Sequence, residues 1–166
     1  MRTGIALGSN LGDRLASLAA GREAVLRLAG VCAPVLLSRV YETEPVGTGA
    51  DAGAFLNAVM EIGFTGEPVA LLAGLRAIES ALGRPTRHPR NAPRTLDLDI
   101  LYIGDLVLND DTLVLPHPRR HLRRFVLTPL NDIRPGLRLP GQSRCVSELL
   151  AQLDEPARVE LFTVGW

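Results

Sequence analysis

The chain of 166 residues contains no lysine, because all 18 of its basic residues are arginine. A Walker A loop needs a lysine at the phosphates, and a protein kinase needs one on a strand, so both motifs are excluded. Schiff-base catalysis through a lysine amine is excluded for the same reason. Any phosphate binding by side chains must therefore rest mainly on guanidinium groups.

Cysteine is scarce as well, and the two that occur, Cys32 and Cys145, lie far apart in the sequence. Their spacing is not that of a zinc site, and two isolated thiols do not make a disulfide framework. No apolar run approaches the roughly 18 residues of a membrane span. The first residues lack the charged-then-apolar pattern of a secretory signal. We therefore expect a cytoplasmic protein that does not enter a membrane.

Net charge is also lacking, since 18 acidic residues balance the 18 arginines. A neutral chain argues against a broad nucleic-acid footprint, so no nucleic-acid partner is expected. The charge is unevenly placed, however: residues 84–124 contain eight arginines and five acidic residues. The length suits one domain, which we place over residues 1–166, and we expect a monomer.

What the sequence does contain is an arginine-rich stretch that runs into a segment of alternating residues at positions 95–100. Alternation with period two is typical of a half-buried strand. It predicts one face with Leu96, Leu98, Ile100 and Tyr102, and another with Thr95, Asp97 and Asp99. The Cα atoms of Asp97 and Asp99 would lie about 6 to 7 Å apart. Both carboxylates could then bind one divalent cation or a pair of cations.

A polar strand face that simply meets water is the plainer interpretation of this pattern. Aspartate is depleted in strands, however, and two like charges side by side repel each other. A cation would relieve that repulsion, and the arginines just upstream offer forks that match phosphate oxygens. From the residues alone, a nucleotide site is the leading hypothesis.

Hydrophobic spacing along the chain predicts strands near residues 3–8, 31–44, 55–62, 95–102 and 159–164. It predicts helices over residues 15–29, 68–82 and 146–153, and a short helix beginning at Pro118. The glycines at positions 4, 8 and 12 do not fit a dinucleotide fingerprint, so we interpret residues 8–12 as a tight turn. The order β-α-β-β-α-β predicts a ferredoxin-like α+β sandwich with a C-terminal extension.

Several segments together resemble one known family. They are residues 6–12 (ALGSNLG), 41–47 (YETEPVG), 55–58 (FLNA), 93–100 (PRTLDLDI) and 115–118 (LPHP). In this order they resemble the 6-hydroxymethyl-7,8-dihydropterin pyrophosphokinases of folate biosynthesis. The resemblance implies an ATP-dependent enzyme that transfers pyrophosphate to the hydroxymethyl group of that pterin and leaves AMP.

The resemblance also implies roles for individual residues. Asp97 and Asp99 would hold two Mg²⁺ ions that bridge the triphosphate, and Arg84 and Arg94 would join them as catalytic residues. The implied ATP-binding residues are Glu79, Arg84, Arg94, His117 and Arg123. Spacing alone would instead put Glu79 on a solvated helix face and His117 in a solvated loop.

For the pterin, the resemblance implies binding by Thr43, Val46, Phe55, Asn57 and Phe125. The two phenylalanines would enclose the ring, and an asparagine offers both the donor and the acceptor that a pterin edge needs. The plainer interpretation is that each phenylalanine is an ordinary core residue. Many members of the family carry Trp-Gly where this chain has Asn91-Ala92, and asparagine has no aromatic face to stack.

Two other functions remain open from the sequence. A two-metal phosphoesterase could use Asp97 and Asp99 with water as the nucleophile, although such sites usually recruit more carboxylates or histidines. A ferredoxin-like RNA-binding module could stack bases on Phe55 and Phe125. The neutral charge and the lack of the aromatic signature of such modules count against RNA.

Overall fold

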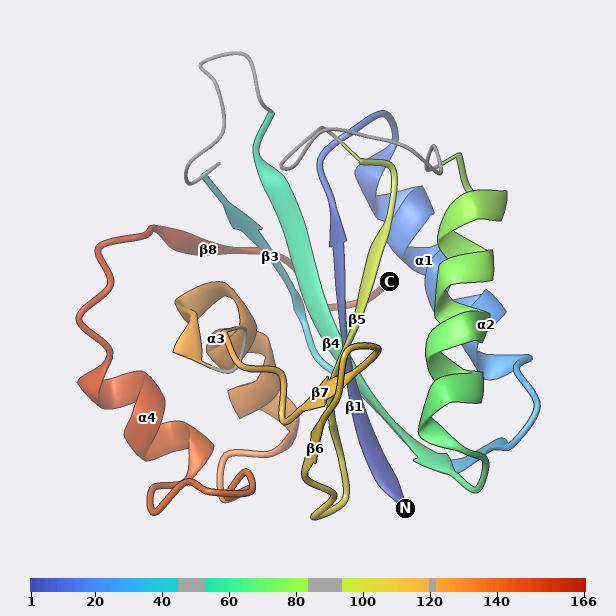
Figure 1. Cartoon of the computed structure of the whole chain (residues 1–166). Coiled ribbons are helices and arrows are strands. Elements are labelled where there is room, and N and C mark those ends of the chain that lie inside the picture. Colours follow the sequence, from blue (N-terminus) through green and yellow to red (C-terminus); the bar gives the residue numbers. More distant parts are fainter. Residues whose placement is uncertain (45–52, 84–93, 120–121) are drawn as a thin grey trace.

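A computed structural model describes residues 1–44, 53–83, 94–119 and 122–166 of the chain (Figure 1). Its strands are β1 (Arg2–Ser9), β2 (Val31–Leu37), β3 (Val40–Thr43), β4 (Phe55–Phe64), β5 (Asp97–Ile103), β6 (Leu108–Asn109), β7 (Val114–Leu115) and β8 (Val159–Thr163). Its helices are α1 (Arg14–Leu26), α2 (Pro68–Ala81), α3 (Arg124–Ile133) and α4 (Val146–Gln152). The predicted loop over residues 45–53 and the arginine-rich segment 84–93 lie largely or wholly outside the described residues.

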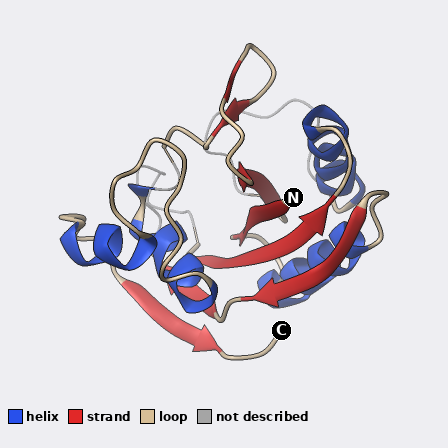
Figure 2. Cartoon of the chain, turned by 90° about the horizontal axis from the view of Figure 1, so that it is seen from below, coloured by secondary structure: helices blue, strands red, loops and turns tan. Residues whose placement is uncertain are grey.

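An antiparallel sheet in the order β5-β1-β4-β3-β8 forms the middle layer, and β2 also pairs with β4. Helices α1 and α2 cover one face, and α3 and α4 lie on the other (Figures 1 and 2). The chain thus has the mixed α and β architecture that the sequence predicts. None of the described helices is long and apolar enough to cross a membrane.

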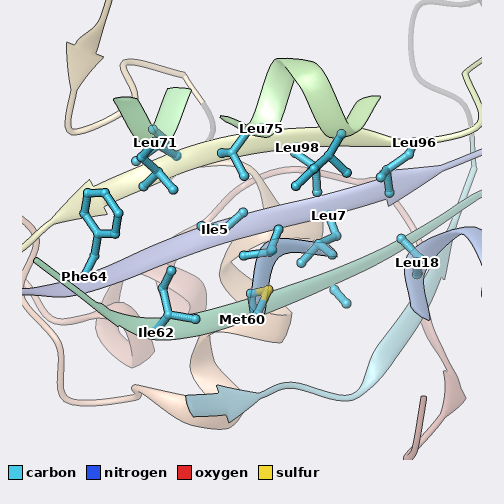
Figure 3. Packing of buried hydrophobic residues seen from close by; sticks show 14 of the residues in the cluster. Ile5, Leu7, Leu18, Met60, Ile62, Phe64, Leu71, Leu75, Leu96 and Leu98 are labelled. Carbon is cyan, nitrogen blue, oxygen red and sulfur yellow. The ribbon is translucent and has the colours of Figure 1, made fainter. Parts of the chain in front are cut away.

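The face under α1 and α2 holds the larger apolar core (Figure 3). Leu71 and Leu75 of α2 pack there, as the helical spacing predicts. Pro68 begins that helix, where its missing N–H costs no hydrogen bond, and Gly83 follows the helix with φ of 95°. Asp13 caps α1 by accepting a hydrogen bond from the Ala16 N–H at 3.0 Å. Strand β1 continues through Ser9, so the turn predicted over residues 8–12 begins only at Asn10 and leads directly into α1.

The single strand predicted over residues 31–44 is in fact two, β2 and β3. They separate at Ser38, whose hydroxyl oxygen accepts the Val59 N–H at 2.9 Å in place of a strand carbonyl. The helix predicted to begin at Pro118 was placed wrongly, since α3 begins at Arg124. The His117 N–H donates to the Leu101 carbonyl at 3.0 Å and holds this segment against β5.

Strand β5 confirms the shared face of its aspartates but corrects the position of Tyr102. Asp97 pairs with Gly8 and Asp99 with Ala6, so both carboxylates lie on one face. The register then shifts between Gly4 and Ile5, which leaves Leu101 as an extra residue. Because of this bulge, Tyr102 belongs to the core under α3 and not to the face of Leu98 and Ile100.

Candidate active site

Among the described residues, several of the predicted site residues lie where β1 ends and where β4 and β5 begin. Asn57 and Asp97 are the register partners of Gly8 on its two sides. We call these three residues the Asp97 row. Side chains of antiparallel partners share a face, so Asn57 and Asp97 face the same way about 10 Å apart. A Cβ built on Gly8 would lie 3.5 Å from Asn57 Oδ1 and 3.9 Å from the Asp97 Cβ. Because Gly8 has no side chain, the sheet surface between these two polar groups stays open.

Asp97 is joined to Arg94, which the resemblance places beside the phosphates. Arg94 Nη1 donates to Asp97 Oδ1 at 2.8 Å, and these side chains are only 17% and 9% exposed. A charge-assisted bond in such a partly buried place is stronger than a surface ion pair. The guanidinium also offsets part of the repulsion between Asp97 and Asp99. The structure thus brings the predicted catalytic residues Arg94, Asp97 and Asp99 together.

Asn10 fixes the backbone of Arg94, a role that the sequence did not indicate. The Asn10 N–H donates to the Arg94 carbonyl at 3.1 Å, and Asn10 Oδ1 accepts the Arg94 N–H at 2.8 Å. Asn10 is 6% exposed, so both bonds are shielded from water. This pair ties the start of β5 to the end of β1, and it sets the direction from which the guanidinium reaches Asp97.

On the other side of Gly8, two predicted pterin-binding residues hold each other. Asn57 Nδ2 donates to Thr43 Oγ1 at 2.8 Å, and both residues are buried. That bond uses one amide proton and leaves the amide oxygen on the Gly8 side. Phe55 is half-buried and pairs with Thr43 in register. Phe55 and Asn57 therefore share the face of the Asp97 row.

Phe125 and Arg123 approach the same face from α3. Asp99 and Val59 are both register partners of Ala6, and Ala6 and Val59 belong to the apolar cluster against which Phe125 packs. Phe125 is half-buried, and the Arg123 guanidinium carbon lies 5.4 Å from the centre of its ring. The predicted aromatic residue and one predicted nucleotide residue are thus in direct contact.

The position of Glu79 contradicts the prediction from spacing alone, which places its side chain on a solvated helix face. Its side chain is buried, and Glu79 Oε1 accepts the Leu98 N–H at 2.8 Å. Strand β5 is at the edge of the sheet, so this N–H has no neighbouring strand to pair with. Sequence spacing could not reveal this, because the acceptor belongs to a helix and the donor to a strand 19 residues away.

One further predicted residue, His117, lies beside this site, and two predicted residues are not described. His117 is half-buried beside β5, and its Nδ1 accepts the Arg119 N–H at 3.4 Å. Val46 and Arg84 lie outside the described residues. Histidine, cysteine, aspartate and glutamate form no cluster of three or more that could hold a metal within the described ranges. Asp97 and Asp99 are the candidate cation ligands because they share a face of β5, and Mg²⁺ often needs only one or two carboxylates when substrate phosphates complete its shell.

The two sides of Gly8 differ in chemistry. One carries carboxylates and a guanidinium, which suit a cation and a phosphate. The other carries an amide and a hydroxyl close to aromatic rings, which suit a flat polar molecule. This arrangement suits an enzyme of the transferase class that moves a phosphate-containing group between two small molecules.

Comparison with known proteins agrees with this class. Residues 4–135 match the family model of 7,8-dihydro-6-hydroxymethylpterin-pyrophosphokinase. The 2-amino-4-hydroxy-6-hydroxymethyldihydropteridine pyrophosphokinase of Pseudomonas aeruginosa is 42% identical over 150 residues, which are 90% of each chain. That of Methylorubrum extorquens is 40% identical over 159 residues, 96% of this chain and 97% of the relative. The chain belongs to the 7,8-dihydro-6-hydroxymethylpterin pyrophosphokinase family.

Solved structures support the fold at much lower identity. A crystal structure of HPPK-DHPS in complex with substrates has a TM-score of 0.66 at 14% identity and covers 90% of this chain. Wild-type HPPK-DHPS of Plasmodium falciparum with pteroate has a TM-score of 0.69 at 14% identity. This chain spans 43% and 42% of the lengths of those two proteins.

Proposed function

We propose that this chain transfers pyrophosphate from ATP to the hydroxymethyl group of 6-hydroxymethyl-7,8-dihydropterin, giving AMP and the pterin diphosphate. Family membership makes it an ATP-dependent pyrophosphokinase of folate biosynthesis. The observation that carries the assignment is the Asp97 row, because its two ends lie about 10 Å apart on one sheet face and would serve as a cation and phosphate side and as a pterin side. The comparisons give no support to a phosphoesterase or an RNA-binding module.

Asp97 and Asp99 would hold Mg²⁺, and we propose two ions. Their shared face and oxygen ligands fit magnesium. When bound, magnesium would neutralise charge on the triphosphate. Arg94 contacts Asp97 directly, so a phosphate bound near these carboxylates also meets a guanidinium. Catalysis in this scheme consists of positioning and electrostatic stabilisation, and we assign no general base.

Asn57 would read the amide edge of the pterin, with Thr43 fixing the orientation of its side chain. Phe55 and Phe125 would contact the two faces of the ring, as their common face of the sheet supports. The resemblance alone supports the pterin contact at Val46 and the phosphate contact at Arg84.

On the nucleotide side, His117 and Arg123 are proposed to bind ATP. Glu79 remains in this set because of the resemblance, and its bond to the Leu98 N–H gives it a further role. By holding the edge of β5 between Asp97 and Asp99, the Glu79 carboxylate would keep the two metal ligands in place.

We also propose a finer description of the fold. Strands β1, β4 and β5 with β2 and β3 as a broken second strand have the order expected of a ferredoxin-like βαββαβ unit. Strand β8 pairs with β3, which supports a single domain over residues 1–166 with a C-terminal extension. We further propose that the protein is a monomer that works in the cytoplasm, with its two substrates as partners and neither a membrane nor nucleic acid.

Product analysis tests the activity. The protein is incubated with ATP, Mg²⁺ and 6-hydroxymethyl-7,8-dihydropterin, and the products are identified by mass spectrometry. We expect AMP and the pterin diphosphate in equal amounts, and no AMP when the pterin is omitted. AMP without a pterin product would support the phosphoesterase instead. Mg²⁺-independent retention of RNA on a filter would support the RNA-binding module.

A further inference from the structure

Glu155 lies between α4 and β8, in the C-terminal segment beyond the residues 4–135 that match the family model. Its side chain is 16% exposed, and it turns back to the start of α3. Glu155 Oε1 accepts the Arg123 Nε–H at 2.7 Å, and Oε2 accepts the Arg124 backbone N–H at 2.6 Å. One carboxylate therefore binds the side chain of the residue before α3 and the first N–H of the helix.

This contact is more than a surface ion pair. Arg123, the residue at the N-cap, makes no capping bond with its own side chain. Glu155 supplies the missing acceptor from 31 residues away, and a carboxylate is favourable at the positive end of a helix. Arg124 in turn donates to the backbone carbonyls of Glu155 at 3.1 Å and Leu153 at 2.6 Å. Four hydrogen bonds thus join the C-terminal segment to the start of α3.

The geometry points to what this does for Arg123. Its Nε–H is taken by Glu155, and its guanidinium lies over the Phe125 ring. A guanidinium held through Nε still presents its two Nη groups, and these can donate to phosphate oxygens. Holding a long side chain in its bound orientation lowers the entropy lost on binding.

We propose that Glu155 is a positioning residue for the nucleotide, acting through Arg123. The proposal rests on the ATP-binding role that the proposed function gives to Arg123. Glu155 also carries a negative charge, which repels the triphosphate and so acts against its positioning effect. A variant without the charge loses both effects, and they must be separated in a background that lacks the arginine.

A double-mutant cycle makes that separation. Calorimetric titration with Mg²⁺ and α,β-methylene ATP, whose α–β linkage cannot be cleaved, gives the affinity of the wild type and of Glu155→Gln, Arg123→Met and the double variant. We expect Glu155→Gln to weaken binding about tenfold in the Arg123 background, which corresponds to about 1.4 kcal/mol. With Met at position 123 the same change should leave binding unchanged or slightly tighter. Asp154→Asn, which removes the same charge at the neighbouring exposed position, should bind like the wild type.

The remaining readouts separate positioning from folding. Glu155→Asp should recover part of the affinity, and thermal unfolding should show every variant folded at the titration temperature. Equal weakening by Glu155→Gln in both backgrounds, or unchanged or tighter binding in the Arg123 background, would overturn the proposal. If Arg123→Met alone left affinity unchanged, the ATP-binding role of Arg123 would fall and this proposal with it. If Arg123→Met weakened binding but Glu155→Gln did not, only this proposal would fall.

Discussion

Strands β5, β1 and β4 carry two polar rows on one sheet face, and only one of them has the form of a site. The Asp97 row consists of Asp97, Gly8 and Asn57. The second, which we call the Glu61 row, consists of Tyr102, Gly4 and Glu61. Each row has a carboxylate, a central glycine and an arginine close by.

The two glycines show how the rows differ. A Cβ on Gly4 would lie 2.3 Å from the Tyr102 ring, so this ring covers the glycine. Glu61 beside it is fully buried and accepts bonds from Arg2 at 2.6 Å and from the Tyr102 hydroxyl at 2.5 Å, with Arg134 at 3.5 Å. No such ring covers Gly8 among the described residues. In this sheet, the carboxylate and arginine that accompany the predicted site residues are those beside the glycine that no ring of the described residues covers.

Removing the carboxylate of the Glu61 row should have the largest effect on the fold. Glu61→Ala leaves the Tyr102 hydroxyl and the guanidinium groups of Arg2 and Arg134 without their shared acceptor. We expect a loss of about 3 kcal/mol in the free energy of unfolding, measured by urea denaturation. Glu160→Ala, at an exposed ion pair on β8, is the control and should change it by less than about 0.5 kcal/mol. A Glu61 variant as stable as the control would contradict the structural role.

Removing a carboxylate near the Asp97 row should affect turnover instead. We expect Asp97→Asn and Asp99→Asn each to lower kcat/KM at least about a hundredfold, because both are proposed metal ligands. Asp97→Asn also weakens the bond to Arg94, so we expect it to cost about 1 kcal/mol of stability. Asp105→Asn, in an exposed turn, is the matched control. Unchanged kcat/KM in both site variants at saturating Mg²⁺ would rule out the metal assignment.

The two tyrosines of the chain, Tyr41 and Tyr102, should have the smallest effect on the free energy of unfolding, and it should be visible only at high pH. Burial and then the hydrogen bond to Asp132 raise the pKa of Tyr41, the register partner of Asn57, to about 12. Burial and then the bond to Glu61 raise the pKa of Tyr102 still further. A raised tyrosine pKa favours the neutral folded form, so the contribution of Tyr41 is complete below pH 10 and is lost between about pH 10 and pH 12.

Ultraviolet titration and urea denaturation measure this directly. In the folded wild type, we expect one tyrosine to ionise near pH 12, and Tyr41→Phe should abolish that step. The same variant should lose less stability than the wild type between pH 10 and pH 12. A step that persists in Tyr41→Phe would show that the Tyr102 hydroxyl is less firmly held than the Glu61 row implies.

The sequence predicted local features of this face well. Alternation at residues 95–100 placed Asp97 and Asp99 together, and helical spacing with Pro68 and Gly83 located α2. It failed at Tyr102, because a bulge becomes visible only when β5 is counted against the register of β1. It failed at Glu79 because the Leu98 N–H needs an acceptor only at an edge of the sheet, and spacing cannot reveal an edge.

The site shows the same limit. The resemblance supplied Thr43, Asn57 and Arg94, and the structure joins Thr43 to Asn57 and Arg94 to Asp97. Asn10 and Glu155 were missed because their contacts cross 84 and 31 or more residues of sequence. Local patterns predict which face a side chain takes, but they do not show which distant segment completes its hydrogen bonds.

One measurement tests the contrast between the two rows most directly: kcat/KM and the free energy of unfolding, determined on the same samples of Gly8→Ala and Gly4→Ala. A methyl group on Gly8 meets only ordinary contacts, so Gly8→Ala should keep the stability of the wild type. The methyl group would occupy the space between Asn57 and Asp97, so we expect it to lower kcat/KM at least about tenfold. A methyl group on Gly4 meets the Tyr102 ring and should cost about 1 to 3 kcal/mol of stability, with kcat/KM of the folded protein near that of the wild type. Wild-type kcat/KM in Gly8→Ala, or a loss of activity explained by unfolding, would contradict the assignment of the Asp97 row as the site.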